Sequence, residues 1–86
     1  MKKITLFYLN GCPHCKKAFN IIEDLKKEDR YKAIEIDSIE EREHADIADK
    51  MDYYYVPCFY IENKKIHEGT VTEEDVKEVF EECLNS

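Results

Sequence analysis

A short apolar segment is followed at once by two cysteines that open an amphipathic helix. In residues 3–9, apolar side chains occupy both alternating faces, which is typical of a central strand covered on both sides. Pro13 suits the first turn of a helix, because the N–H that proline lacks would have no partner there. Apolar residues then recur at helical spacing, namely Cys15, Ala18, Phe19, Ile22 and Leu25. The pattern predicts a buried strand that runs into a helix, with Cys12 and Cys15 at the junction.

The next part of the chain is predicted to form a strand and a charged helix. Residues 31–36 are expected to be the second strand, and Asp37 and Ser38 a turn that caps the helix. The acidic run at residues 40–43 is expected to lie on a solvated helix surface. The inner side of this helix would carry Ala45, Ala48 and Met51.

The last third of the chain predicts a hairpin and a final helix. Residues 58–61 and 65–68 have strand patterns, and residues 62–64 form a tight turn between them. Thr72, with Asp75 three residues later, approximates a capping box at the start of the helix. One apolar stripe follows it, made of Val76, Val79, Phe80, Cys83 and Leu84.

The order is therefore strand, helix, strand, helix, strand, strand, helix. A right-handed crossover makes the first two strands parallel, and the hairpin adds an antiparallel pair to the same sheet. The 86 residues make one α/β domain, because a chain of this length has room for a single core. A content of 43% apolar residues, with two Gly and two Pro, is typical of a globular chain.

Charge excludes two classes of partner. Thirteen Lys and Arg against 20 Asp and Glu leave a formal charge of −7, which repels nucleic acid and anionic lipid surfaces. The apolar stretch at residues 4–9 is shorter than the roughly 7 to 15 residues of a signal-peptide core. We therefore expect a monomer in the cytoplasm that binds neither nucleic acid nor membrane.

The spacing of Cys12 and Cys15 predicts thiol–disulfide chemistry. A cysteine just ahead of a helix gains from the first-turn N–H groups and the helix dipole, which stabilise its thiolate. Cys12 is thus the candidate nucleophile, and the more buried Cys15 is the candidate resolving thiol that displaces the product from Cys12.

Metal binding is the main alternative for this pair, because two cysteines at this spacing are half of a zinc site. The other half should be a second close pair, whereas Cys58 and Cys83 lie 25 residues apart. Cys83 falls on the apolar stripe of the last helix and is expected in the core. For Cys58 two interpretations stay open, a small buried side chain or a third thiol in the exchange.

The Cys12-Pro13-His14-Cys15 cluster after a buried strand, Val56-Pro57 before a hairpin, and Gly69 before the final helix together resemble the thioredoxin superfamily. Its glutaredoxins and glutaredoxin-like small thioredoxins are the most similar branch, and the resemblance covers nearly the whole chain. It implies a thioredoxin-like βαβαββα fold, a four-stranded mixed sheet flanked by three helices. It also implies that Pro57 is cis and that the Val56 backbone takes up a peptide or glutathione as an added strand.

Several positions differ from the glutathione-binding pattern of that family. Tyr55 stands where glutaredoxins usually have Thr, and Leu9 where they have a basic residue. Thr72 and the N–H groups of the last helix are still expected to bind a substrate carboxylate, and Glu73 is expected to be part of the same substrate-binding region. The segment at residues 53–55 is expected either to form an aromatic wall beside the site or to pack below the hairpin.

Two further positions bear on the redox couple. His14 matches disulfide-introducing oxidases of the bacterial periplasm, a resemblance that implies a stabilised thiolate at Cys12 and an oxidising dithiol. Thioredoxins place a buried acidic residue where this chain has Leu6, which implies different proton handling.

The sequence thus predicts an enzyme that reduces or exchanges protein disulfides, with electrons from glutathione or a reductase. No permanently bound cofactor is expected, and glutathione is a candidate co-substrate. The first alternative is a glutathione-dependent glutaredoxin that acts through Cys12 alone. An iron–sulfur module is the other, although Pro13 stands where cluster-binding members commonly have a small residue.

Overall fold

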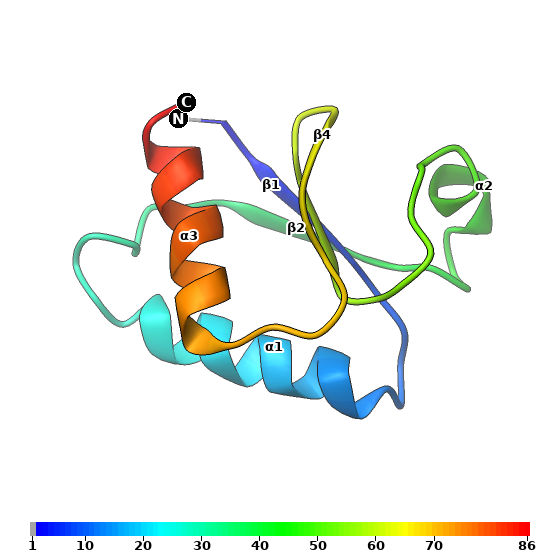
Figure 1. Cartoon of the computed structure of the whole chain (residues 1–86), viewed down its shortest axis with the longest axis horizontal. Helices are drawn as coiled ribbons and strands as arrows, with labels where there is room; N and C mark the ends of the chain where they lie inside the picture. Colours follow the sequence, from blue (N-terminus) through cyan, green and yellow to red (C-terminus); the bar gives the residue numbers. More distant parts are fainter. Residues whose placement is uncertain (1) are drawn as a thin grey trace.

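A mixed four-stranded sheet with the strand order β2-β1-β3-β4 forms the centre of the molecule. The computed structural model describes residues 2–86. β1 is central, since it pairs in parallel with β2 and antiparallel with β3, and β4 completes the hairpin (Figure 1). The elements are β1 (Ile4–Tyr8), α1 (Pro13–Leu25), β2 (Ile36–Glu40), α2 (Ala45–Ala48), β3 (Cys58–Ile61), β4 (Lys64–Glu68) and α3 (Glu73–Leu84). The predicted order and mixed sheet are confirmed.

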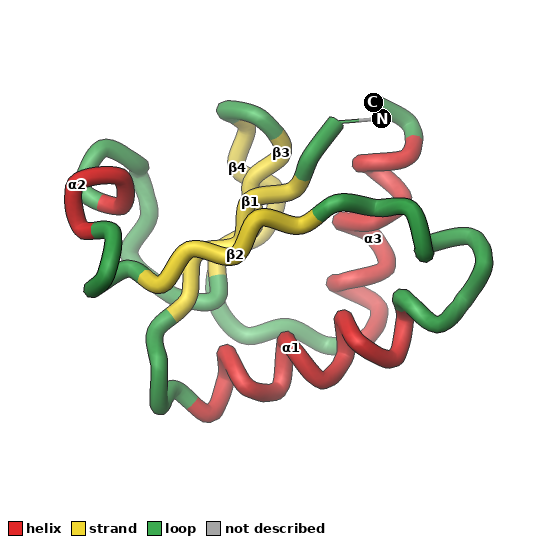
Figure 2. Tube along the Cα trace, turned by 180° about the vertical axis from the view of Figure 1, so that it is seen from behind, coloured by secondary structure: helices red, strands yellow, loops and turns green. Residues whose placement is uncertain are grey.

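The two faces of the sheet are covered unequally. α1 and α3 lie next to each other, with α2 at the opposite side of the molecule (Figure 2). Alternate residues of β1 point to the two sides, so that Ile4 and Leu6 join the core under α1 and α3 while Phe7 joins a smaller cluster near α2. Within residues 2–86, no helix combines the length and the apolar character needed to cross a bilayer.

The prediction for the second strand was wrong by five residues. Tyr31 and Ile34 are buried, but they lie in a turn-rich connection that packs them against the larger core. The Tyr31 ring lies 5.2 Å from that of Phe80, and its hydroxyl donates to the Glu81 carboxylate at 2.7 Å. β2 begins only at Ile36 and contains the residues expected to form the turn. It is an edge strand, so a polar sequence is tolerated there.

The charged helix is also shorter than predicted. α2 ends at Ala48, and Met51 follows it in a bend while still packing on the smaller cluster. The acidic run before α2 is not wholly solvated, because Glu40 is 3% exposed and ends β2.

Candidate active site

Cys12 and Cys15 lie at the junction between β1 and α1. Gly11 has a φ of +86°, a conformation open to glycine, and it turns the chain toward the helix. The Cys12 backbone N–H donates to the Leu9 carbonyl at 3.2 Å, which closes the loop. Cys12 is the N-cap of α1 and Pro13 its first residue, so Cys15 falls within the first helical turn. The predicted start of the helix is confirmed.

The Cys12 thiol is half-buried, and its surroundings favour the thiolate. A hydrogen bond from the Cys15 backbone lowers the pKa of Cys12, and the Cys15 thiol and the His14 backbone add to this effect. Burial and the negative charge of Glu41 oppose it. The helix start therefore supplies N–H donors to a negatively charged sulfur at this position.

Cys15 has the opposite character. Its side chain is buried, and burial raises the pKa of the Cys15 thiol to about 11. A hydrogen bond from the Leu9 backbone works against that rise, whereas the neighbouring Cys12 and the charge of Glu41 add to it. The pair thus combines Cys12, whose thiolate is favoured, with Cys15, whose thiol stays protonated before it attacks Cys12.

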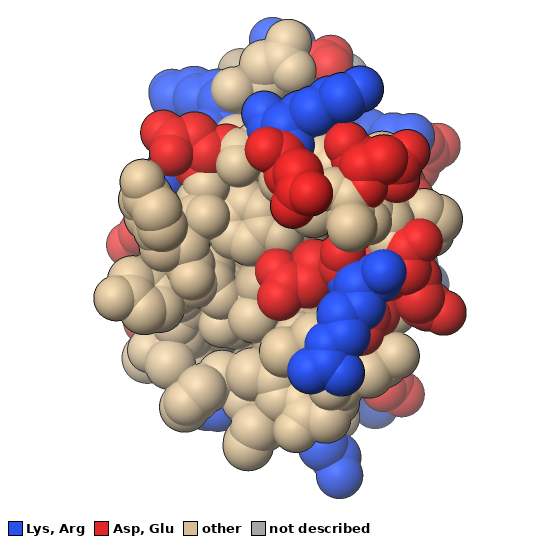
Figure 3. Space-filling view, turned by 90° about the vertical axis from the view of Figure 1, so that its right-hand side faces the viewer, with Lys and Arg blue, Asp and Glu red and all other residues tan. Residues whose placement is uncertain are grey.

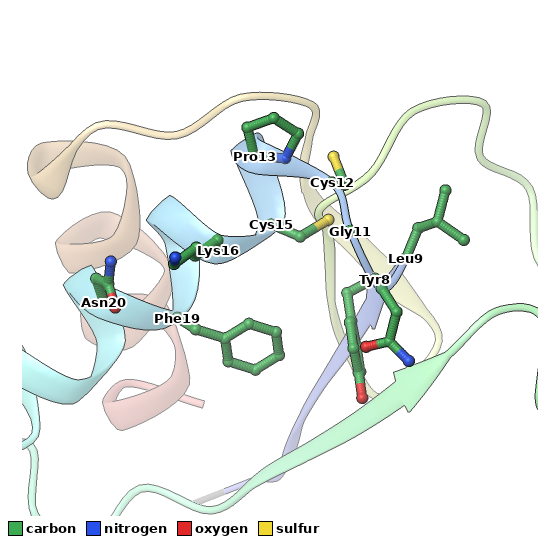
Figure 4. Close-up of a pocket in the computed structure, with 10 residues that line it drawn as sticks. Tyr8, Leu9, Gly11, Cys12, Pro13, Cys15, Lys16, Phe19 and Asn20 are labelled. Atoms are coloured by element: carbon green, nitrogen blue, oxygen red, sulfur yellow. The ribbon is translucent and has the colours of Figure 1, made fainter.

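A cavity of about 530 Å³ opens beside the two cysteines. Figure 4 shows both sulfur atoms on the same side of the start of α1, with Tyr8 and Phe19 further along the pocket. The rings of Tyr8 and Phe19 meet edge to face at 4.9 Å and make much of its apolar lining. No sequence motif marks Tyr8 or Phe19, because both look like ordinary core positions of a strand and a helix.

The two residues between the cysteines differ in their relation to this pocket. Pro13 lines it, together with Lys16 from the next turn (Figure 4). The His14 side chain is exposed and is not part of the lining. The contribution of His14 that bears on the Cys12 sulfur comes from its backbone.

The segment before β3 lies at the same end of the sheet as the cysteines. Cys58 pairs with Phe7 of β1, so Val56 and Pro57 come just beyond the end of β1, from which the cysteine loop departs. The Val56–Pro57 peptide bond is cis, as the resemblance implied. The Pro57 carbonyl accepts from the Gly69 N–H at 2.9 Å, which anchors the segment to the end of the hairpin.

The three tyrosines that precede Val56 divide into two kinds. Tyr53 packs, stacking on Phe7 with ring centroids 5.1 Å apart. Tyr54 and Tyr55 are 83% and 70% exposed, so the packing interpretation holds for Tyr53, whereas an aromatic wall made by the other two stays a prediction. Figure 3 shows the end of the molecule that carries α2 and the start of α1, with uncharged side chains over its left and lower parts and charged ones above and to the right.

A carboxylate that sequence reasoning missed holds the tyrosine segment in place. Glu68 of β4 accepts from the backbone N–H groups of Tyr54 and Tyr55, at 2.5 and 2.9 Å, and from the Lys65 ammonium at 2.7 Å. The Lys65 bond, followed by these amides, lowers the pKa of Glu68 to about 2. No local motif marks Glu68, since the contact spans 13 and 14 residues and depends on the hairpin.

Thr72 and Glu73 stand at the start of α3, away from the cysteine pocket. Figure 1 places the start of α3 near the half of α1 that is remote from its cysteines. The predicted capping box is confirmed: the Thr72 hydroxyl accepts from the Asp75 N–H at 3.2 Å, and the Thr72 N–H donates to the Asp75 carboxylate at 2.9 Å. Glu73, Glu74 and Asp75 fill the first turn with negative charge.

Cys58 and Cys83 lie in different core clusters and do not form a second pair of metal ligands. Cys58 is fully buried in the cluster near α2, and burial raises the pKa of its thiol to about 12. Cys83 is fully buried in the larger core and donates to the Lys2 carbonyl at 2.8 Å. In the part of the chain from residue 2 onward, no three His, Cys, Asp or Glu side chains are grouped so as to hold a metal ion.

Comparisons with solved structures agree with this fold. The oxidised thioredoxin of Plasmodium falciparum is similar with a TM-score of 0.70 and 18% identity, over 92% of this chain and 77% of that one. The thioredoxin of Malassezia sympodialis is similar with a TM-score of 0.72 and 15% identity, over 92% and 71%. The first two thioredoxin domains of Saccharomyces cerevisiae Eps1p give 0.57 and 24%, over 92% of this chain and 34% of that one.

At the level of sequence, no curated protein gives a significant match. The family model described as Glutaredoxin matches residues 4–66, a stretch that includes Cys12, Cys15 and the cis proline. With its fold, its Cys12–Cys15 junction and this match together, the chain belongs to the glutaredoxin family.

Proposed function

We propose that this protein is a dithiol oxidoreductase that reduces or exchanges disulfides of protein substrates through Cys12 and Cys15. Its family supports thiol–disulfide chemistry in general. The observation that supports the dithiol mechanism is the difference in burial and pKa between the two thiols at the start of α1. A half-buried thiol with a lowered pKa stands there next to a buried thiol whose pKa is about 11.

The reaction follows from this arrangement. The Cys12 thiolate attacks one sulfur of a substrate disulfide, so that a mixed disulfide forms and the other substrate sulfur leaves as a thiolate. Cys15 then loses its proton and attacks the Cys12 sulfur. The Cys12–Cys15 disulfide forms, the bond to the substrate breaks, and the substrate departs with two electrons. Glutathione or a reductase restores the dithiol, and no bound cofactor takes part.

The second candidate is a glutathione-dependent glutaredoxin that acts by Cys12 alone, and family membership favours it. Three features of the chain support the dithiol route instead. The Thr72 N–H and hydroxyl are already occupied by Asp75, three acidic residues crowd the start of α3, and Leu9 replaces a basic residue. An incoming carboxylate would meet repulsion at that helix start.

Equilibration in glutathione redox buffers, followed by alkylation and intact mass, tests this proposal. A single transition to the Cys12–Cys15 disulfide without a lasting adduct is expected. A stable adduct of one glutathione on Cys12 would contradict the proposal and identify the monothiol route. Cys15→Ser is the matched variant, because it should abolish turnover of protein disulfides in the dithiol route and leave activity on glutathione mixed disulfides in the other.

The remaining assignments are part of the same proposal. Val56 and Pro57 would receive the substrate strand, with the exposed Tyr54 and Tyr55 beside it. A net charge of −7 supports action on proteins rather than on nucleic acids or lipid surfaces. We place the enzyme in the cytoplasm as a monomer, where reduced glutathione and reductases supply electrons.

A further inference from the structure

The cavity beside the cysteines has mostly apolar walls. Its lining residues come from the end of β1, the loop after it and the first part of α1. Tyr8, Pro13 and Phe19 belong to this lining, and the rings of Tyr8 and Phe19 point toward one another (Figure 4). Its volume of about 530 Å³ lies within the range of roughly 300 to 1,000 Å³ that is typical of ligand pockets. The pocket therefore has room for a large side chain of a bound molecule.

Both reacting thiols belong to the same lining. Cys12 and Cys15 line the pocket, and their sulfur atoms lie on one side of the start of α1 (Figure 4). Consecutive residues of a chain are only about 3.8 Å apart, so a substrate bonded to the Cys12 sulfur brings the neighbours of its own cysteine to this pocket. Within residues 2–86, the lining does not include Val56 or Pro57. The pocket is therefore a second contact for the substrate, separate from the added strand.

The pocket also carries one positive charge. In the described part of the chain, Lys16 is the one Lys, Arg, Asp or Glu of the lining. Lys16 is exposed, and none of the ion pairs within residues 2–86 includes it. Asn20 lines the pocket one turn later on the same face of α1, and its amide can also donate to an oxygen. An ammonium without an acidic partner, followed by an amide, favours a carboxylate on the bound molecule.

We propose that this pocket is a specificity site, which selects protein disulfides whose cysteine stands beside a large apolar side chain and an acidic residue. The apolar side chain packs against the rings of Tyr8 and Phe19. The carboxylate binds the Lys16 ammonium, with the Asn20 amide as a second donor. The inference rests on the proposed dithiol function, for which it names the class of substrate.

The walls of the pocket favour a protein segment over glutathione as the occupant. Glutathione offers carboxylates but no large apolar side chain, so it would leave the rings of Tyr8 and Phe19 in contact with water. The negative charge of Glu41 acts on Cys12, but Glu41 is not among the lining residues. An acidic side chain can therefore approach Lys16 without meeting a carboxylate in the lining itself.

Peptides of equal length with one internal disulfide test the proposal. The residues on both sides of the first cysteine are varied: Phe or Ser is combined with Asp or Asn, and the rest of the peptide is constant. Excess peptide oxidises the reduced protein, so that the thiols of Cys12 and Cys15 become a disulfide and the peptide takes up two electrons and two protons as two thiols. Acid quenching, alkylation and intact mass give the rate of this oxidation.

The apolar contact is measured by the ratio of the rates for the Phe and Ser peptides, in which any general change in Cys12 reactivity cancels. We expect a ratio of about tenfold for the wild type and about threefold for Phe19→Ala. Ile21→Ala is the control, because Ile21 is another half-buried apolar residue of α1 but lies outside the lining. Equal rates for the Phe and Ser peptides in the wild type would overturn the inference, and this comparison needs no variant to fold.

The charge contact is measured by the ratio for the Asp and Asn peptides in a matched pair of variants. Lys16→Gln and Lys17→Gln change the net charge equally, and both lysines are exposed, but only Lys16 lines the pocket. The repulsion of acidic peptides by the net charge of −7 is therefore common to both variants. We expect Lys16→Gln to lower the ratio about threefold and Lys17→Gln less than about 1.5-fold. Equal effects of the two variants would contradict the proposed contact.

Two further outcomes separate the possible failures. If no peptide forms the Cys12–Cys15 disulfide, the dithiol function itself is wrong. If the disulfide forms at rates that do not depend on the flanking residues, the dithiol function stands and the specificity site does not. Glutathione disulfide that oxidises the protein faster than the peptide with Phe and Asp would assign the pocket to glutathione and overturn the proposal.

Discussion

The two faces of the sheet differ in depth. Beneath α1 and α3, fourteen buried residues form one continuous core, whereas the cluster near α2 has four, supplemented by Ile39, Met51 and Tyr53 at its edge. α2 itself has four residues, too few to cover a sheet. Most of the stability should therefore come from the face that supports α1, while the other face leaves the segment before Pro57 exposed. Cys12 and Cys15 stand at the start of α1, which covers the deep face, and the exposed Tyr54 and Tyr55 border the shallow one.

The largest expected effect concerns the deep face. Phe80→Ala removes a fully buried ring that packs on Tyr31, and it should lower the free energy of unfolding by about 3 to 5 kcal/mol. Denaturant unfolding measures this loss. A decrease below about 1 kcal/mol would show that the deep core is not the main source of stability.

The matched change on the shallow face is Met51→Ala. Met51 is half-buried, so we expect a loss of about 1 to 2 kcal/mol in the same unfolding experiment, less than for a fully buried methionine. The rate of Cys12 alkylation should stay unchanged. A loss equal to that of Phe80→Ala would erase the distinction between the two faces.

The contribution of Glu81 to the stability of the deep face should depend on pH. Its bonds with Arg30, and then with Tyr31, lower the pKa of Glu81 to about 2 from the usual 4.5. A lowered pKa means that the carboxylate stabilises the fold above pH 4.5 and that this contribution is lost as the pH falls toward 2. Glu81→Gln should therefore lose less stability between neutral and acid pH than the wild type does. Parallel losses in denaturant midpoints at the two pH values would contradict this.

The smallest expected effect is on the rate of reduction, from Glu68→Gln on the shallow face. The bonds that hold Glu68 lower its pKa to about 2, as those of Glu81 do, so a comparable loss of stability is expected at neutral pH, and the tyrosine segment would also lose its anchor. We expect reduction of a protein disulfide to slow by about twofold, with Cys12 alkylation unaffected. The exposed Glu62→Gln, in the hairpin turn, is the control. Unchanged reduction would exclude a role for this anchor.

The parts of the fold that the sequence predicts well are those with strong local signals. Pro13 fixes the start of α1, Thr72 and Asp75 cap α3, and the hairpin turn stands where the apolar pattern breaks. Cys12 and Cys15 are likewise identified by their spacing alone. Each of these features depends on residues that are close in the chain.

The features that were missed depend on contacts between distant segments. Tyr31 and Ile34 look like strand residues because they are apolar, yet they are buried by α1 and α3 rather than by strand pairing. Glu40 and Glu68 look like solvated acids, yet each also binds distant backbone amides, at Asn10, 30 residues away, and at Tyr54 and Tyr55, 14 and 13 residues away. A buried carboxylate held by backbone amides has no sequence signature, since every residue except proline offers an N–H.

Each face also encloses one fully buried cysteine outside the Cys12–Cys15 pair. Cys83 is fully buried in the deep core, and Cys58 in the shallow one. Neither thiol reacts with a reagent in water until its surroundings open, so the rate at which each is modified in the folded protein reports the opening of its own face. The modification rates of Cys58 and Cys83 thus report local unfolding of the two faces separately, and Cys58 should be modified faster.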